Sequence, residues 1–261
     1  MTALATAGPA TRPQRAVLRL HRPALIVWGA FLLLAIGDLL WLHLFRAPAE
    51  RTSMACDFEI TDCSGGPGYQ AFTDVNNVMN FTGEVVSRVS IVVAAWAGAA
   101  LIGRELETGT ARLAWTQGVS PARWLTAKLT GAALPLTAGT TLLTLVFAWV
   151  WTADQDVLVA NWSYARFLVS DGPLAVALVL TALAVGALAG VAIGRALPAL
   201  AVAAVAAYAL RWFFGDKWDN IWPARHYWPV QITSTVLLLL IAALATVLTF
   251  RLLARRTESR S

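Results

Sequence analysis

The chain has few charged residues: 13% of its 261 residues are charged, whereas 58% are hydrophobic. A soluble domain usually carries about a quarter charged residues. Water could not solvate a surface of this composition, so we expect lipid to cover much of it. The shortage of charge therefore argues against an ordinary soluble domain and predicts an integral membrane protein.

Residues that carry catalysis are also scarce. The three histidines are scattered, and the sequence offers no histidine or cysteine spacing typical of a metal site or a nucleophile–base pair. The only lysines are Lys128 and Lys217, and neither belongs to a Gly-x-x-x-x-Gly-Lys-Ser/Thr loop. We therefore expect no catalytic residues, no metal and no cofactor bound by this chain, and any ATP and Mg²⁺ that drive its work would bind to another polypeptide.

Long apolar runs dominate what is present. Each is long enough, at roughly 17–25 residues, to cross about 30 Å of hydrocarbon as a helix. We predict an all-α polytopic membrane protein with a cytoplasmic tail and interfacial helix over residues 1–23, a transmembrane domain over 24–253 and a second tail over 254–261. The six predicted spans are Ala24–Phe45, Val85–Gly103, Leu125–Trp151, Val169–Gly194, Pro198–Phe214 and Val230–Leu253.

Basic residues are unevenly divided between the two sides of these spans. Thirteen of the 20 lysines and arginines fall on the side of the termini. The positive-inside rule places that side in the cytoplasm, and an even number of spans predicts both termini there, in a cell-membrane protein. Because the basic residues flank the spans, we attribute the high pI to topology and expect no nucleic acid partner. A cleaved signal peptide ending near Ala49 is the less favoured alternative, since the first apolar run is long for a signal.

The segment before the first span is amphipathic. Arg15, Arg19 and Arg22 recur at helical spacing with aliphatic residues between them, and Pro23 follows. This pattern predicts a short interfacial helix with a corner at Pro23. The alternative is a simple positive anchor for the first span.

Residues Arg46–Gly83 are predicted to form a long outer loop. Cys56 and Cys63, the only cysteines, both lie in it on the oxidising side. We expect them to form a disulfide, with two free thiols as the alternative.

Small residues and charges mark two further features of the spans. Gly186, Gly190 and Gly194 have four-residue spacing, which predicts close helix packing against another span or a second subunit. Asp38 and Arg88 lie at similar depth near the outer ends of the first two spans. We expect an ion pair between them rather than a substrate or proton site; Glu84, one turn away, is a second candidate partner for Arg88.

The first inner loop, residues 104–124, holds the most specific pattern. Thr110 can cap a short helix over Thr110–Gln117 that Gly118 ends, and Ser120 with Pro121 can begin the next span. A helix held between two spans can act as a lever if its exposed side chains bind a soluble partner. The alternative is an ordinary connector.

These residues carry a family resemblance. The sequence resembles permease subunits of type-2 ATP-binding-cassette (ABC) exporters, most of all those of the actinobacterial branch. The segments that carry this resemblance are Glu105–Thr110, Leu113–Gln117 and Ser120–Trp124, followed by Lys128-Leu129. The resemblance implies that the loop helix is the coupling helix that binds a cassette ATPase. The residues expected at that contact are Glu105, Glu107, Thr110, Arg112, Leu113 and Trp115. Of these, Arg112 and Glu107 would make polar contacts, and Leu113 and Trp115 would form an apolar plug.

The resemblance also implies partners and a direction. Permeases of this class pair with a second copy or a paralogue, bind two ATPase subunits and usually export, and the apolar spans suit an amphiphilic or hydrophobic substrate. Their re-entrant element before the last span would map to Gly215–Pro229 here. A membrane anchor or accessory subunit of an envelope complex, which transports nothing, is the alternative function, and a membrane-embedded enzyme is disfavoured.

Overall fold

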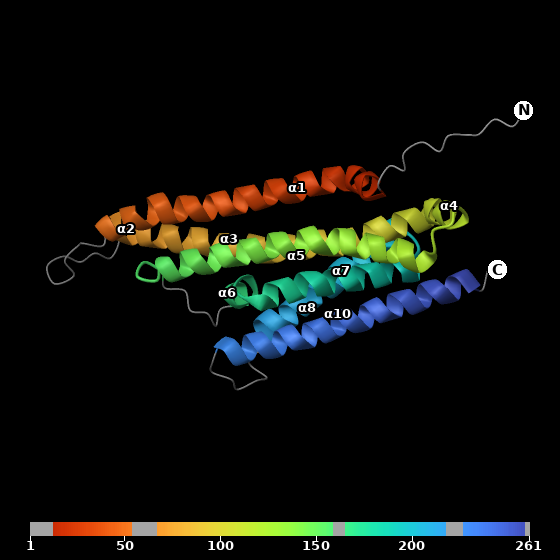
Figure 1. Ribbon diagram of the computed structural model, residues 1–261. Helices are drawn as coiled ribbons and strands as arrows, with labels where there is room; N and C mark the ends of the chain where they lie inside the picture. Colours follow the sequence, from red (N-terminus) through yellow and green to blue (C-terminus); the bar gives the residue numbers. More distant parts are fainter. Residues whose placement is uncertain (1–12, 54–66, 159–164, 218–226, 259–261) are drawn as a thin grey trace, which may run out of the picture.

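The computed structural model describes residues 13–53, 67–158, 165–217 and 227–258, and these are helical apart from short connections. Six of the helical segments are long and apolar enough to cross a membrane, which confirms the all-α polytopic fold. Figure 1 shows them as a bundle of long, roughly aligned helices. In chain order the elements are α1 (Pro13–Trp41), the π-helix η1 (Leu42–Arg46), α2 (Ala47–Ser53), α3 (Pro67–Glu107), α4 (Thr110–Thr116), α5 (Pro121–Ala153), α6 (Ala165–Ser170), α7 (Pro173–Ile193), α8 (Ala196–Trp212), the π-helix η2 (Phe213–Lys217) and α10 (Tyr227–Glu258).

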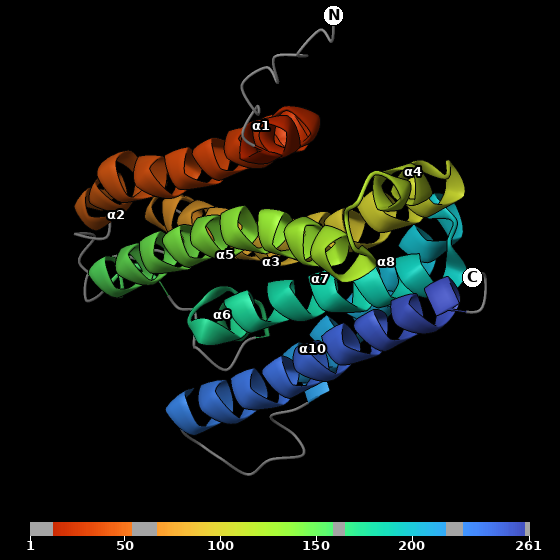
Figure 2. The same cartoon turned by 45° about the vertical axis from the view of Figure 1, so that its right-hand side comes forward.

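Helix α7 is the centre of the bundle. It packs against α3, α5, α8 and α10, and most of its side chains are buried. Figures 1 and 2 both show it between these helices. The sequence of α7 is apolar on every side, as expected for a helix that is surrounded by other helices.

Glycines bring the backbones of α3 and α7 together. A Cβ on Gly98 of α3 would lie 2.3 Å from the carbonyl oxygen of Leu183, and one on Gly186 would lie 2.8 Å from that of Ala95. Gly190 meets α3 one turn further on. The partner of the predicted glycine face is therefore a span of the same chain.

Gly194 has a different role from the one expected. It ends α7 in the left-handed conformation, at φ 69°, so it is a C-cap rather than a residue of the packing face.

Helices replace much of the predicted outer loop. The first span continues through η1 and α2 to Ser53, and α3 begins at Pro67 rather than near Val85. With 41 residues, α3 is about 61 Å long, roughly twice the thickness of a hydrocarbon core. Leu42, Ala47, Val75 and Met79 are buried in a second core at this end, which explains why helices persist in a segment with so many polar residues.

The fourth span begins at Pro173, four residues after the predicted start at Val169. Helix α6 ends at Ser170, and α7 begins at Pro173 after Gly172, whose φ is 88°. The buried side chain of Gln231, on α10, satisfies this break: its Nε2 donates to the carbonyl oxygens of Leu168 and Asp171, and its Oε1 accepts from the N–H of Leu174. Asp171, Gly172 and Pro173 are typical turn and helix-start residues and mark this break in the sequence. Its partner Gln231 could not be identified in the same way, because it comes from another span.

The N-terminal segment is part of α1 and not a separate helix, because α1 is continuous from Pro13. Figures 1 and 2 show its first turns, in the darkest red, turned away from the line of the rest of the helix. A proline inside a helix commonly causes such a change of direction. The predicted corner is therefore a bend within one helix.

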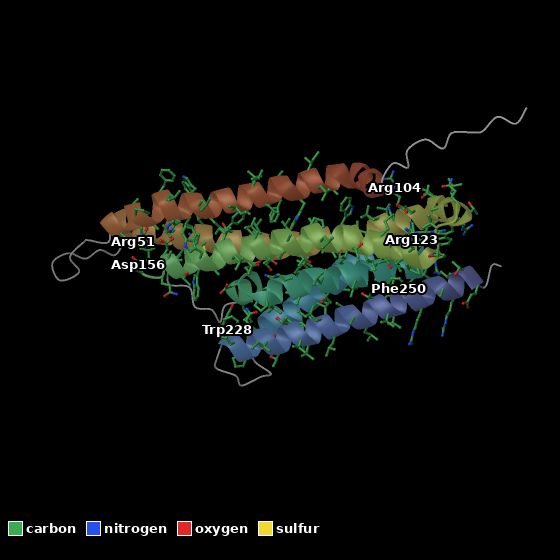
Figure 3. The ribbon with its side chains drawn as sticks, viewed as in Figure 1. Arg51, Arg104, Arg123, Asp156, Trp228 and Phe250 are labelled. Atoms are coloured by element: carbon green, nitrogen blue, oxygen red, sulfur yellow. The ribbon has the colours of Figure 1, made fainter. Side chains whose placement is uncertain are left out.

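Both described ends of the chain lie at one end of the bundle. Helix α1 begins and α10 finishes at the end where α4 lies (Figure 1). Figure 3 places Arg104 and Arg123 at this end, and Arg51 and Asp156 at the opposite one. We call these the α4 end and the far end. Cys56, Cys63 and residues 218–226 of the expected re-entrant element lie outside the described residues.

Candidate functional site

The candidate site is α4 with its supports at the α4 end of the bundle. Two glycines with positive φ bracket it: Gly109 (φ 75°) stands at its N-cap and Gly118 (φ 88°) follows it. The expectation that Gly118 takes the left-handed conformation is confirmed. Thr110 is not the cap, however; it is the first residue of α4, and its hydroxyl donates to the carbonyl oxygen of Glu105 at 3.3 Å. The chain thus turns sharply on both sides of a seven-residue helix.

Two glutamates tie the end of α3 to other helices. Glu105 accepts from the Trp124 indole N–H at 2.9 Å and from Lys128 Nζ at 2.5 Å, which links α3 to α5. Glu107 accepts from the backbone N–H of Ala196 at 3.0 Å. It supplies the N-terminal cap that Arg195, the N-cap residue of α8, does not provide with its own side chain. Both carboxylates therefore support the site from within the chain, whereas we had expected them at the ATPase contact.

The inner side of α4 is packed against the bundle. Ala111 is fully buried in a core with Trp124, Ile102 and Leu253. The Trp115 ring stands edge-on to Trp124, with their centroids 5.8 Å apart. Trp115 therefore anchors α4 to the beginning of α5, and we no longer assign it to an apolar plug for a partner.

The outer side of α4 is uncovered. Arg112, Leu113, Thr116 and Gln117 are exposed, and Leu113 keeps 60% of its surface open to solvent. Ser120 then caps α5 by accepting from the N–H of Arg123, with Pro121 in the first turn as predicted. The arrangement is a short helix fixed rigidly on one side and free on the other.

A pocket of about 420 Å³ lies beside α4. Its walls come from the ends of α3, α7 and α10 and from α4 and Pro121, with Arg112, Arg195 and Arg256 among its lining residues. The Arg256 guanidinium donates to the carbonyl oxygen of Ala192, which fixes it at the end of α7.

The expected Asp38–Arg88 ion pair is wrong. Asp38 accepts from the Thr82 hydroxyl at 2.5 Å. Arg88 instead pairs with Glu84 at 2.8 Å, the alternative that the sequence offered. Glu84 also pairs with Arg211 at 3.0 Å, and Arg211 is 5% exposed and donates to Ser87. Glu84 is thus paired with an arginine from α8, which is not an adjacent span in the sequence. Similar depth on consecutive spans was therefore a poor guide to the ion pairs.

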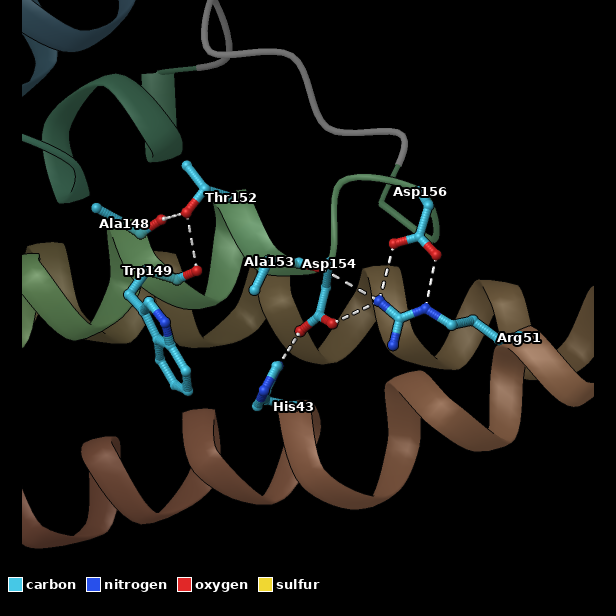
Figure 4. A network of polar contacts seen from close by, with 8 residues as sticks. All are labelled: His43, Arg51, Ala148, Trp149, Thr152, Ala153, Asp154 and Asp156. Carbon is cyan, nitrogen blue, oxygen red and sulfur yellow. Dashed lines mark hydrogen bonds and ion pairs between the residues drawn. The ribbon is translucent and has the colours of Figure 1, made fainter.

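A polar network at the far end was missed by sequence reasoning. Figure 4 shows the fully buried Asp154 accepting from Arg51 at 2.8 Å and paired with His43 at 2.9 Å. Arg51 also donates to Asp156 at 2.6 Å. The network ties η1 and α2 to the end of α5. His43 and Arg51 lie more than 100 residues before Asp154, so no local pattern could have revealed the network.

Among the described residues, no group of three or more histidines, cysteines or carboxylates is arranged to hold a metal ion.

Comparison with known proteins gave one family match. The family model described as ABC-2 membrane transporter related matches residues 25–216, which cover the first five spans and α4. No curated protein and no solved structure matched the chain. Because the match covers well over half of the chain, this protein belongs to the ABC-2-related membrane transporter family and has the transporter permease role that the family implies.

Proposed function

We propose that this chain is the membrane-spanning subunit of an exporter of the actinobacterial type-2 class, and that a separate cassette ATPase drives it through α4. The observation that carries the proposal is the asymmetry of α4: one side is fixed to three spans, and the other side is open. A rigid element is needed to transmit ATPase closure to the spans, because a flexible loop would absorb the motion.

The exposed side of α4 supplies the contact. Leu113 is the apolar anchor, and Arg112, Thr116 and Gln117 surround it with polar groups. A few buried aliphatic or aromatic anchors within a polar rim provide most of the binding energy of protein interfaces. The ties from Glu105 to α5 and from Glu107 to α8 carry movement of α4 to the spans.

We infer the substrate class from the spans. The groove between α1, α3 and α5 is lined by apolar and small residues and by Trp28 and Trp96. Such a surface suits an amphiphilic or hydrophobic substrate. Helices α1 and α10 keep most of their surface uncovered, with exposed aliphatic residues such as Leu33 and Leu244, and we propose that lipid and a second permease copy or paralogue cover it.

Binding to the ATPase tests the proposal. The full chain would be co-expressed with a cassette ATPase encoded beside it, and the complex isolated through a tag on the ATPase. We expect Leu113→Asp to lower recovery of the permease by about tenfold or more, because it puts a charge in the apolar centre of the contact. Leu34→Ala, which shortens a leucine that is 75% exposed on α1, is the control for surface truncation and should leave recovery unchanged.

The alternative function makes a different prediction. A membrane anchor or accessory subunit would not need α4 for an ATPase contact. Undiminished recovery of Leu113→Asp would therefore contradict the coupling role, and failure of the wild-type chain to bind any cassette ATPase would favour the anchor.

A further inference from the structure

The pocket beside α4 has three guanidinium groups and no carboxylate among its lining residues. They come from three separate elements: Arg112 from α4, Arg195 from the α7–α8 turn and Arg256 from α10. In the described part of the chain, Arg112 and Arg195 have no side-chain hydrogen bond or ion pair, while the nearby Glu105 and Glu107 are engaged elsewhere. The pocket is therefore strongly positive and suited to an anion.

Much of the remaining wall is apolar. Leu106, Trp115, Ile193 and Leu253 line the same pocket, and Ile193 is 37% exposed. An inorganic anion would use only the arginines and leave this wall without a partner. A ligand that satisfies both parts of the pocket has an anionic head and an apolar body.

The position of the pocket identifies the source of such a ligand. It lies where α7 and α10 reach the α4 end, and α7 is just long enough to cross a hydrocarbon core, at 21 residues or about 31 Å. Ile193 and Gly194, its last residue and its C-cap, line the pocket. The pocket is therefore at the level of the lipid headgroups. Basic pockets between membrane helices are typical binding sites for anionic lipids.

We propose that this pocket binds the phosphate headgroup of an anionic phospholipid, with the guanidinium groups of Arg112 and Arg195 on the phosphate and the upper acyl chains against Ile193. Because Arg112 belongs to α4, a bound lipid joins the α4 helix to the ends of α7 and α10. The inference rests on the pocket alone and does not require the proposed ATPase partner.

Lipid titration of the full-length chain in detergent tests this inference. Native mass spectrometry would measure binding of dioleoyl phosphatidylglycerol and, separately, of dioleoyl phosphatidylcholine. We expect the wild type to prefer phosphatidylglycerol, and Arg112→Gln/Arg195→Gln to lower its affinity for this lipid by about tenfold to thirtyfold, since each basic residue near an anionic headgroup contributes about 1 kcal/mol.

The matched control is Arg123→Gln/Arg255→Gln. These two arginines are also exposed at the α4 end but do not line the pocket. Both double variants remove two positive charges, so they change the net charge of the protein equally. The control should keep the preference of the wild type, and size-exclusion profiles show whether each variant is folded.

Several outcomes would overturn the inference. Equal binding of the two lipids by the wild type, or equal losses in the two double variants, would leave only a general effect of charge. Full competition by inorganic phosphate at millimolar concentration would assign the pocket to a free anion. An unchanged lipid preference in Arg112→Gln/Arg195→Gln would also contradict the inference, whatever its effect on ATPase binding, because Arg112 borders the proposed ATPase contact as well.

Discussion

At the residue scale, buried polar side chains take partners from helices that are distant in sequence. Arg211 reaches Glu84, Gln231 reaches the α6–α7 break and Asp154 reaches Arg51. The sequence shows that such groups need partners, since an unpaired buried charge is costly. It cannot identify those partners, because they depend on which helices become neighbours. The Asp38–Arg88 pair was wrong for this reason, and the Arg88 side chain, at 59% exposed, is not buried at all.

Removal of Arg51 should destabilise the far end of the molecule. Arg51→Ala leaves the buried Asp154 with only His43 and also breaks the contact with Asp156. We expect the free energy of unfolding to fall by about 1–3 kcal/mol, the usual cost of a buried charged group that loses a hydrogen bond. Thermal unfolding in detergent measures the effect, with the exposed Arg123→Ala as control. Equal melting temperatures for the two variants would contradict the assigned role of the network.

Asp171 and Asp156 should have opposite effects on pH dependence. Burial raises the pKa of the Asp171 carboxyl, although a hydrogen bond from Tyr227 opposes the shift. This raised pKa contributes stability that is fully present at pH values below the unfolded-state pKa of about 3.9. The contribution is lost as the pH rises through the folded-state pKa. Asp171→Asn cannot ionise, so its melting temperature relative to the wild type should increase between pH 4 and pH 8.

The Arg51 guanidinium lowers the pKa of Asp156. The stability contributed by Asp156 is present above its unfolded-state pKa and is lost as the pH falls through the folded-state pKa. Asp156→Asn should therefore be less stable than the wild type at pH 8 and approach it in acid. Parallel pH profiles for Asp171→Asn and Asp156→Asn would show that these environments do not act as described.

At the element scale, long apolar runs predicted the existence of all six spans, because about 20 apolar residues suffice to cross a bilayer. Local chemistry likewise predicted Ser120, Pro121 and Gly118 at the boundaries of α5 and α4. The helical segments at the far end were missed, because their many polar residues are typical of a loop. Their apolar residues form a second core that only the three-dimensional structure reveals. Thr110 was misplaced by one residue, because Gly109 provides the turn that begins α4.

Close packing of α3 on α7 should depend on Gly98. A Cβ there would lie 2.3 Å from a backbone oxygen, which cannot move without displacing the helix. We expect Gly98→Ala to lower stability by about 1–3 kcal/mol, the usual cost of overpacking. Gly37→Ala is the matched control, because a Cβ at Gly37 meets nothing within 4 Å. It should be neutral or stabilising by up to about 1 kcal/mol. Equal effects in thermal unfolding would show that α3 and α7 are not in close contact.

At the scale of the whole molecule, an even number of spans places both described ends at the α4 end, and the basic residues predict that this end is cytoplasmic. Single cysteines introduced in a chain with Cys56→Ser and Cys63→Ser test the orientation. A membrane-impermeant maleimide applied to intact cells should label Ala49→Cys, on the exposed side of α2, and not Arg255→Cys. Labelling with the opposite pattern would invert the topology and place α4 out of reach of a cytoplasmic ATPase.

In the proposed mechanism, α4 transmits ATPase movement to the spans. The most direct measurement follows substrate transport and ATP hydrolysis together, in liposomes that contain the permease and its ATPase. The variant replaces residues 110–117 with a flexible glycine–serine linker of equal length, and Gly37→Ala serves as a correctly folded control. We expect ATP hydrolysis to persist while transport falls to background, because a flexible linker cannot convey the motion. Transport at the wild-type rate through the linker variant would show that α4 does not transmit this movement.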